Sequence, residues 1–166
     1  MNLPPAIANA DAIPSVLLRR VFNHWKALAG DRIGPRRSEI SPVNLKFALP
    51  LLWMWDVIDG GKDFQFRLSG ERIKTFIDID VNGKRLSQLD KSVFIDEVRF
   101  VFEHCVSARA PLIVGPMPMS HEPRRHHIVT AIVLPLSENG TDVSTLFGAT
   151  EAEAMVAAKS QHALNS

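Results

Sequence analysis

The 166-residue chain has a mass of 18.4 kDa, which is enough for one domain with a sizeable core and too little for two. Hydrophobic residues make up 46% and charged residues 22%, and the formal net charge is +1, so the composition excludes disordered and fibrous classes and predicts no nucleic-acid partner. The single cysteine, Cys105, excludes an intramolecular disulfide and a multi-cysteine metal site, and the lack of tyrosine excludes chemistry that needs a phenol.

No targeting or membrane segment is predicted. Residues 1–12 lack the basic start and the apolar stretch of a signal peptide. The longest apolar run, from Phe47 to Trp55, contains a proline and is far shorter than the roughly 20 residues of a membrane-spanning helix. We therefore expect a cytoplasmic protein without a membrane partner.

The first predicted element is an amphipathic helix between Pro14 and Gly30. Its apolar residues recur at helical spacing: Leu17, Leu18, Val21, Trp25 and Leu28. A short helix is expected next, capped by Ser41, begun by Pro42 and ended before Pro50.

A β-hairpin is predicted to follow. The apolar residues 51–58 favour a strand, and Asp59-Gly60-Gly61-Lys62 is typical of the turn that reverses one. The next strand alternates apolar and polar residues, which predicts that one face of it is buried. The residues expected on that buried face are Phe64, Phe66 and Leu68.

The middle of the chain is predicted to be helical. Residues 71–77 indicate a short helix, residues 78–83 a turn, and residues 91–109 a long helix. With Val98 at the centre of its apolar face, the long helix is expected to bury Phe94, Val101, Phe102 and Cys105. Phe100 then projects from the opposite side, so we name it as a candidate contact residue.

Three strands are predicted for the remainder, at residues 112–119, 126–135 and 142–148. Pro116 and Pro118 cannot donate backbone hydrogen bonds, so the first of these strands should lie at a sheet edge. The second is apolar on both faces and should lie inside the sheet. Thr150-x-x-Glu153 resembles a capping box, which predicts a helix in the C-terminal tail.

The order of two strands, a helical middle and three strands resembles that of the PAS superfamily. The residues that carry this resemblance are Phe64-x-Phe66-Arg67-Leu68-x-Gly70 and Gly83-Lys84-x-Leu86-x-x-Leu89. Together with Trp25-x-x-Leu28-x-Gly30, Leu49-Pro50 and Leu134-Pro135-Leu136, they resemble a group of bacterial stand-alone PAS proteins over residues 14–148.

The resemblance implies an α+β fold, the PAS fold. In it a five-stranded antiparallel sheet, ordered second, first, fifth, fourth and third strand, has helices on one face above a ligand pocket. It also implies a division into an N-terminal extension (1–44), a PAS domain (45–148) and a tail (149–166). An amphipathic helix outside a PAS core pairs with its copy or covers the open face of the sheet. We predict a homodimer formed through the sheet face or through Leu17, Val21, Trp25 and Leu28.

No metal site is predicted. His121-Glu122 begins like the zinc motif HExxH, but Pro123 breaks a helix and the second histidine is absent. His126 and His127 are adjacent in a predicted strand and should face opposite sides. Asp78-x-Asp80-x-Asn82-Gly83 begins like an EF-hand loop, but its twelfth position is Leu89 rather than glutamate, so it indicates a turn.

No catalytic residue and no known cofactor are predicted either. Haem is not expected, because haem-binding PAS domains carry a histidine near the start of the long helix, where residues 91–103 contain none. Flavin is not expected, because the helical middle lacks the Asn-Cys-Arg-Phe-like stretch of flavin photosensors. Gly-rich phosphate loops and nucleophile elbows are absent from the sequence.

These observations predict a sensory or regulatory signalling module that binds a small apolar ligand, a protein partner or both, and not an enzyme. The candidate pocket residues are Trp53, Phe64, Phe66, Phe76, Val101 and Ile132, each of which also fits an ordinary core. Two alternatives remain at this point. One is a ligand-free protein-interaction scaffold, and the other is a small-molecule enzyme that uses the region of His126 or Arg67.

Overall fold

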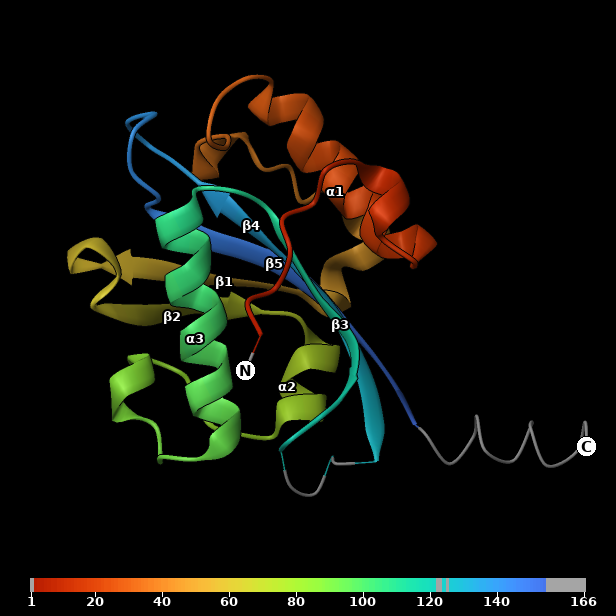
Figure 1. Ribbon diagram of the computed structural model, residues 1–166, viewed down its shortest axis with the longest axis vertical. Helices are drawn as coiled ribbons and strands as arrows, with labels where there is room; N and C mark the ends of the chain where they lie inside the picture. Colours follow the sequence, from red (N-terminus) through yellow and green to blue (C-terminus); the bar gives the residue numbers. More distant parts are fainter. Residues whose placement is uncertain (1, 122–123, 125, 155–166) are drawn as a thin grey trace, which may run out of the picture.

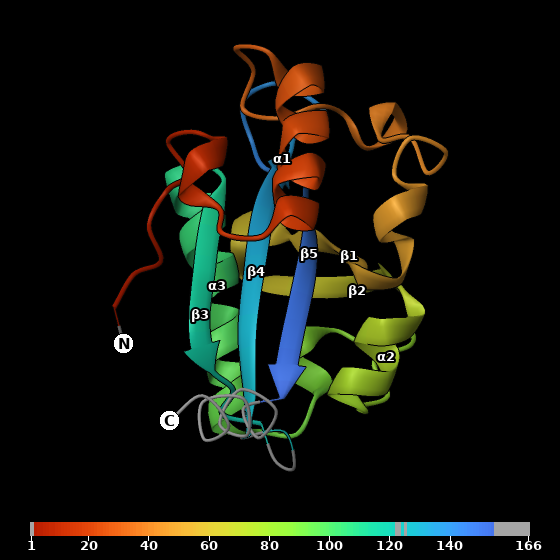
Figure 2. The same ribbon diagram turned by 90° about the vertical axis from the view of Figure 1, so that its right-hand side faces the viewer.

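The computed structural model describes residues 2–121, 124 and 126–154 and contains one five-stranded antiparallel sheet. Its strands lie in the order β2-β1-β5-β4-β3, which confirms the predicted fold class and strand order. The strands are β1 (Leu52–Ile58), β2 (Asp63–Ser69), β3 (Leu112–Pro118), β4 (His127–Leu136) and β5 (Thr145–Ala154). Helices cover both faces of this sheet (Figures 1 and 2).

Three α-helices accompany the sheet in the described residues: α1 (Val16–Ala29), α2 (Glu71–Ile77) and α3 (Val93–Ala108). The two longer ones start at serine caps, because Ser15 Oγ accepts from the Leu18 amide and Ser92 Oγ accepts from the Ile95 amide, each at 3.1 Å. Gly30, at φ 59°, ends α1 in the left-handed region that favours glycine. None of the helices described is long and apolar enough to cross a membrane.

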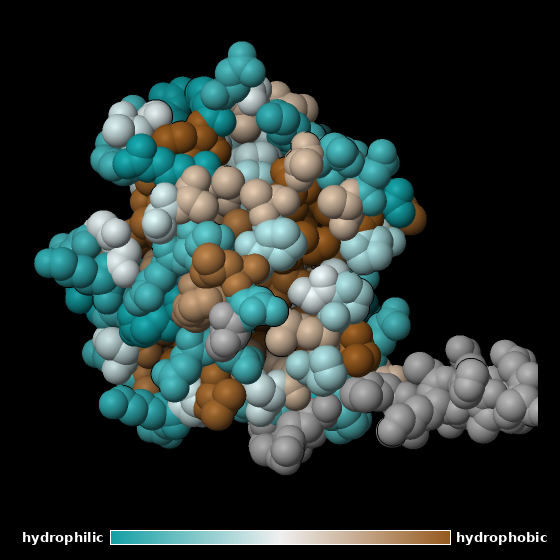
Figure 3. Space-filling view, viewed as in Figure 1, coloured by the Kyte–Doolittle hydropathy of each residue, from teal (hydrophilic) through white to brown (hydrophobic). Residues whose placement is uncertain are grey.

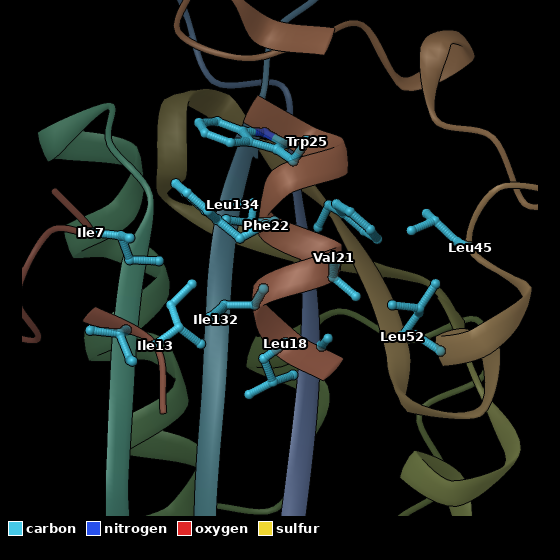
Figure 4. Close-up of a cluster of buried hydrophobic side chains, with 14 of the residues drawn as sticks. Ile7, Ile13, Leu18, Val21, Phe22, Trp25, Leu45, Leu52, Ile132 and Leu134 are labelled. Atoms are coloured by element: carbon cyan, nitrogen blue, oxygen red, sulfur yellow. The ribbon is translucent and has the colours of Figure 1, made fainter. Parts of the chain in front are cut away.

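Helix α1 lies across β4 and β5 on the face of the sheet opposite α3 (Figure 2). Four of its apolar side chains lie in the core between the helix and the sheet, as the close-up in Figure 4 shows: Leu18, Val21, Phe22 and Trp25. Val21 and Leu18 are fully buried there, next to Ile132 and Leu134 of β4. The helix therefore covers the open sheet face, which is one of the two roles predicted for it.

The other face of the sheet carries a second, more aromatic core under α2 and α3. Phe102 of α3 is its centre, with ring centroids 5.2 Å from Phe64, 5.5 Å from Trp53 and 5.9 Å from Trp55. Cys105 is fully buried in this core, so the predicted apolar stripe of the long helix is confirmed at both residues. The sheet thus separates two hydrophobic clusters.

Strand β2 contains a bulge that corrects the predicted alternation. Leu68 pairs with Met54, whereas Phe66 pairs with Trp55, so Arg67 is an extra residue without a partner in β1. The extra residue turns the following side chain to the other face, and Leu68 is 44% exposed. The prediction that Leu68 shares the buried face with Phe64 and Phe66 was therefore wrong.

Strand β5 is longer than predicted and replaces the start of the expected C-terminal helix. All ten residues of β5 pair with the ten residues of β4, from Leu136 opposite Thr145 to His127 opposite Ala154. Pairing with β4 outweighs the local preference of residues 150–153 for a capping box. The prediction that a helix begins at Thr150 was therefore wrong. The rest of the expected helix, residues 155–166, lies outside the described residues.

The segment before β1 also differs from the prediction. Residues 42–45 form a turn in which Ser41 Oγ accepts from the Asn44 amide at 3.3 Å, and a 3₁₀ helix follows at Lys46–Leu51 with Pro50 inside it. Further towards the N-terminus, residues 2–7 run beside the edge strand β3. The Ile7 amide donates to the Pro111 carbonyl at 2.8 Å, and the Ile113 amide donates to the Pro5 carbonyl at 3.1 Å.

Candidate functional site

A cavity of about 490 Å³ lies between the inner face of the sheet and the helices α2 and α3. All five strands contribute to the sheet side of its wall, through residues such as Trp53, Phe66, Val114, Ala131 and Thr150. The volume falls within the range of about 300–1,000 Å³ that is typical of small-molecule sites. The fold therefore forms a ligand-sized, partly open cavity at the position that the PAS resemblance implies.

The helical side of the cavity is also hydrophobic. Helix α3 contributes Phe94, Val98 and Val101, and α2 contributes Ile73 and Phe76. These residues lie at spacings of three or four along each helix, so each helix presents one face to the cavity. A continuous apolar lining of this kind favours an apolar ligand.

The N-terminal segment forms part of the wall as well, because Asn2, Leu3, Pro4 and Pro5 line the cavity. In Figure 1 this segment passes beside α3, in front of the sheet. The space-filling view from the same side shows hydrophobic surface in the middle of this face, framed by hydrophilic residues (Figure 3). The segment therefore separates part of the cavity from solvent.

Polar groups are few in the lining, and two pairs of them are hydrogen-bonded. The Trp53 indole Nε1 donates to Thr150 Oγ1 at 2.9 Å, which holds the ring against β5. Ser120, just after β3, donates from Oγ to Glu97 Oε2 of α3 at 2.6 Å. Ser69 and Lys74 also line the cavity, and Lys74 is exposed to solvent.

Two residues between β3 and β4, His121 and Arg124, contact the C-terminal end of α2. His121 Nε2 donates to the Ile77 carbonyl at 2.9 Å, and Arg124 Nε donates to the Phe76 carbonyl at 3.1 Å. The guanidinium of Arg124 is favourable at the C-terminal end of a helix, where the carbonyls lack partners in the helix. These contacts hold the loop beside Phe76, which lines the cavity.

Four of the six predicted pocket residues line the cavity: Trp53, Phe66, Phe76 and Val101. Phe64 does not, because its side chain is fully buried against Phe102 in the core. Ile132 does not either, because it faces α1 on the opposite side of the sheet. The two flanking residues, Ala131 and Val133, line the cavity instead, as the alternation of a strand requires.

Glu97, Ser120 and Thr150 are cavity residues that the sequence analysis did not identify. The pattern of the long helix was read from its apolar residues alone, and Thr150 was interpreted as the cap of a C-terminal helix. The sequence does contain a signal for Glu97: it lies three residues from Phe94 and four from Val101, which puts it on the same face of the helix as these two residues.

The predicted dimer residues lie mostly within the chain's own core. Val21 is fully buried and Trp25 is 3% exposed, so neither offers surface to a second copy in this structure. Leu17 and Leu28 are half-buried. Phe100 is half-buried as well, rather than projecting freely from α3.

The histidines near the start of β4 differ from their predicted arrangement. His126 precedes β4 in a turn, so its ring lies 4.3 Å from that of His127 (centroid to centroid) instead of on the opposite face. Burial, together with the neighbouring His126, lowers the pKa of His127. Glu122 and Pro123 of the HExxH-like sequence lie outside the described residues.

Other reactive groups form no alternative site in the part of the chain that the structure describes. Burial raises the pKa of the Cys105 thiol to about 12, so the thiol stays protonated and unreactive. Asp78, Asp80 and Asn82 border a shallow hollow of about 430 Å³ beside α2. The Asp80 carboxylate there accepts from the Asn82 amide at 3.2 Å, as expected for a turn, and no group of three potential metal ligands occurs among the described residues.

Comparison with known proteins agrees with this geometry. No curated protein and no solved structure matches the chain. A family model described as PAS domain matches residues 14–151, which include α1 and nearly all of the sheet. Because this match covers most of the chain and the strand order is that of the PAS fold, the chain belongs to the PAS domain family.

Proposed function

We propose that the protein is a sensory or regulatory module that binds a small apolar ligand between its sheet and the helices α2 and α3. The cavity of about 490 Å³ is the observation that carries this proposal. The cavity is partly open and leaves apolar side chains of the sheet and the helices uncovered, and covering such surface is favourable. The apolar walls favour a ligand whose transfer from water is driven by the hydrophobic effect.

Two observations weigh against the alternatives. A ligand-free scaffold is expected to fill its centre, whereas this cavity is bordered by side chains from all five strands. An enzyme requires several converging titratable groups, but Glu97 and Lys74 are the charged side chains among the described lining residues. The ligand-binding proposal therefore requires the fewest additional assumptions.

Ligand binding in this cavity can also change how the protein binds a protein partner. The cavity wall includes α2, α3 and the N-terminal segment, and the outer surfaces of these same elements face solvent. A ligand that favours one arrangement of these elements changes the surface that a partner meets. We propose a cytoplasmic signalling protein or a second copy of the chain as that partner.

Native mass spectrometry of the protein purified from its own host tests whether a ligand is present. We expect a stoichiometric extra mass that disappears on denaturation, and the mass difference then identifies the ligand. An absorption spectrum of the same sample reports any haem or flavin. A bare mass, under conditions that preserve other weak complexes, would favour the scaffold alternative.

A cavity-filling substitution tests the location of the site with octanol as the probe. Ala131→Phe places a ring in the space beside Trp53, so we expect octanol to bind at least about 10-fold more weakly, as followed by tryptophan fluorescence. Thr130→Phe is the matched control, because Thr130 is the next residue of β4 and does not line the cavity. Equal octanol affinity in the wild type and both variants would place the ligand elsewhere.

A further inference from the structure

We infer that the ligand carries a hydrogen-bond-donating, cationic nitrogen on an otherwise apolar body, and that Glu97 receives this nitrogen. The inference rests on the proposed function and specifies its ligand class. It depends on the one acidic side chain among the described cavity residues and on the groups around it.

Glu97 occupies a cavity-facing position of α3. Phe94, Val98 and Val101 lie on the same side of the helix and line the cavity together with it. Glu97 is half-buried, in contrast to the exposed Glu103 two turns further along. Glu97 is therefore partly shielded from water beside apolar neighbours, where an electrostatic contact is stronger than it is in bulk water.

The Glu97 carboxylate has one hydrogen-bond donor among the described residues, which is the Ser120 hydroxyl. Ser120 Oγ donates to Oε2 at 2.6 Å, and no other described residue donates to either oxygen. A carboxylate has about four acceptor sites, so Oε1 retains capacity for a donor within the cavity. Ser120 also holds the side chain in position, because it joins the loop after β3 to α3.

Glu97 has no cationic partner among the residues that the structure describes. The other half-buried acids near α3 and β2 are paired: Arg99 lies 3.4 Å from Asp63, and Arg67 lies 3.0 Å from Asp56. A carboxylate in apolar surroundings is costly unless a charge or hydrogen bonds compensate it. A ligand ammonium group supplies both a charge and donors, which a neutral apolar ligand does not.

Lys74 provides the opposite possibility, an anionic ligand. Its residue is exposed on α2 and also borders the shallow hollow next to the cavity. A lysine in water is well solvated and gains little from an ion pair, whereas Glu97 is half-buried and positioned by Ser120. The geometry therefore favours a cation over an anion.

Three probes with the same alkyl chain separate these possibilities: octylamine, octanol and octanoate, titrated at neutral pH by tryptophan fluorescence and calorimetry. We expect octylamine to bind most tightly. Glu97→Gln should weaken octylamine binding by about 10-fold or more, because a charge-assisted hydrogen bond is replaced by a neutral one, and leave octanol binding unchanged. Glu103→Gln, on the exposed side of the same helix, should change neither affinity.

Every other result contradicts either this inference or the proposed function. Equal affinities for octylamine and octanol, or an octylamine affinity that Glu97→Gln leaves unchanged, would overturn the inference while the apolar site remains. Tightest binding of octanoate would also overturn it and assign the polar contact to Lys74. If none of the three probes binds, the proposed function itself fails. Should Glu97→Gln not fold by circular dichroism, Ser120→Ala, which releases the carboxylate, should reduce the preference for octylamine over octanol.

Discussion

The indole of Trp25 links α1 to the sheet through a single buried hydrogen bond. Its Nε1 donates to the Pro135 carbonyl at 2.9 Å, and its ring lies beside Phe22 in the core between α1 and the sheet. Trp25→Phe removes the donor and leaves the carbonyl unsatisfied. We expect the free energy of unfolding to fall by about 1–3 kcal/mol in urea titrations followed by circular dichroism. A loss within experimental error would mean that water replaces the indole.

Whether a residue lines the cavity depends on which face of its strand or helix carries the side chain. For some residues the sequence pattern does not determine this face. Trp53 and Phe76, which were named as pocket candidates for their aromatic character and positions, line the cavity. Ile132 was placed on the wrong face, because β4 is apolar on both sides and its pattern does not distinguish them. The tertiary structure decides this by placing α1 against one side and α3 against the other.

At the level of elements, the N-terminal segment connects the cavity to the edge of the sheet. Two backbone hydrogen bonds, at Ile7 and Ile113, hold it against β3, and Asn2 to Pro5 line the cavity. Removing residues 2–6 therefore opens one wall of the site. We expect octanol to dissociate several-fold faster in stopped-flow fluorescence, because a ligand no longer waits for this segment to move.

A control for this truncation keeps the length of the segment and changes only its apolar contacts. Replacing Leu3, Pro4 and Pro5 by serine retains the Pro5 carbonyl that accepts from Ile113. Faster dissociation in both variants would assign the effect to the cavity wall. Unchanged dissociation in the truncated chain would show that ligands leave by another route.

The elements themselves were largely predictable. The serine-capped and glycine-terminated α1, the hairpin of β1 and β2, and the long α3 all follow from local patterns. Strand β3 lies at the edge that its prolines require. Two of the errors occur at the bulge at Arg67 and at the second half of β5, where pairing with another strand determines the conformation.

For the whole molecule, two histidines make stability depend on pH. Burial lowers the pKa of His24 below 6.5, and burial with the nearby His126 and Arg124 lowers that of His127 below 6.5. Each folded-state pKa is depressed, so the stability contribution is complete above the unfolded value and is lost as the pH falls through the folded value. We expect the unfolding midpoint in urea to decrease as the pH is lowered from about 7.5 to about 5.

The double variant His24→Asn, His127→Asn removes both titrating groups and provides the comparison. Its urea midpoint should decrease less over the same pH range than that of the wild type. Replacing the exposed Asn23 by alanine is the control, and this variant should keep the pH profile of the wild type. Identical profiles for the double variant and the wild type would contradict the assignment to these histidines.

The whole molecule also determines which surfaces remain for a partner. Covering the sheet with α1 buries Val21 and Trp25, so a substitution such as Val21→Asp is expected to destabilise the fold whether or not the protein dimerises. Mass measurements on that variant therefore do not isolate an interface. Exposed apolar residues, such as Val43 at 70% and Val16 at 67%, are better positions at which to test the oligomeric state.

By itself, the sequence determined the α+β class, the main helices and strands, the edge position of β3 and the resemblance that the PAS family match bears out. These properties depend on periodicity, caps and proline, which act over a few residues. Only the tertiary structure decided which face of β4 meets the cavity, how far β5 extends, and that Glu97 and Ser120 meet there. Those features depend on contacts between segments far apart in the chain, which no local pattern encodes.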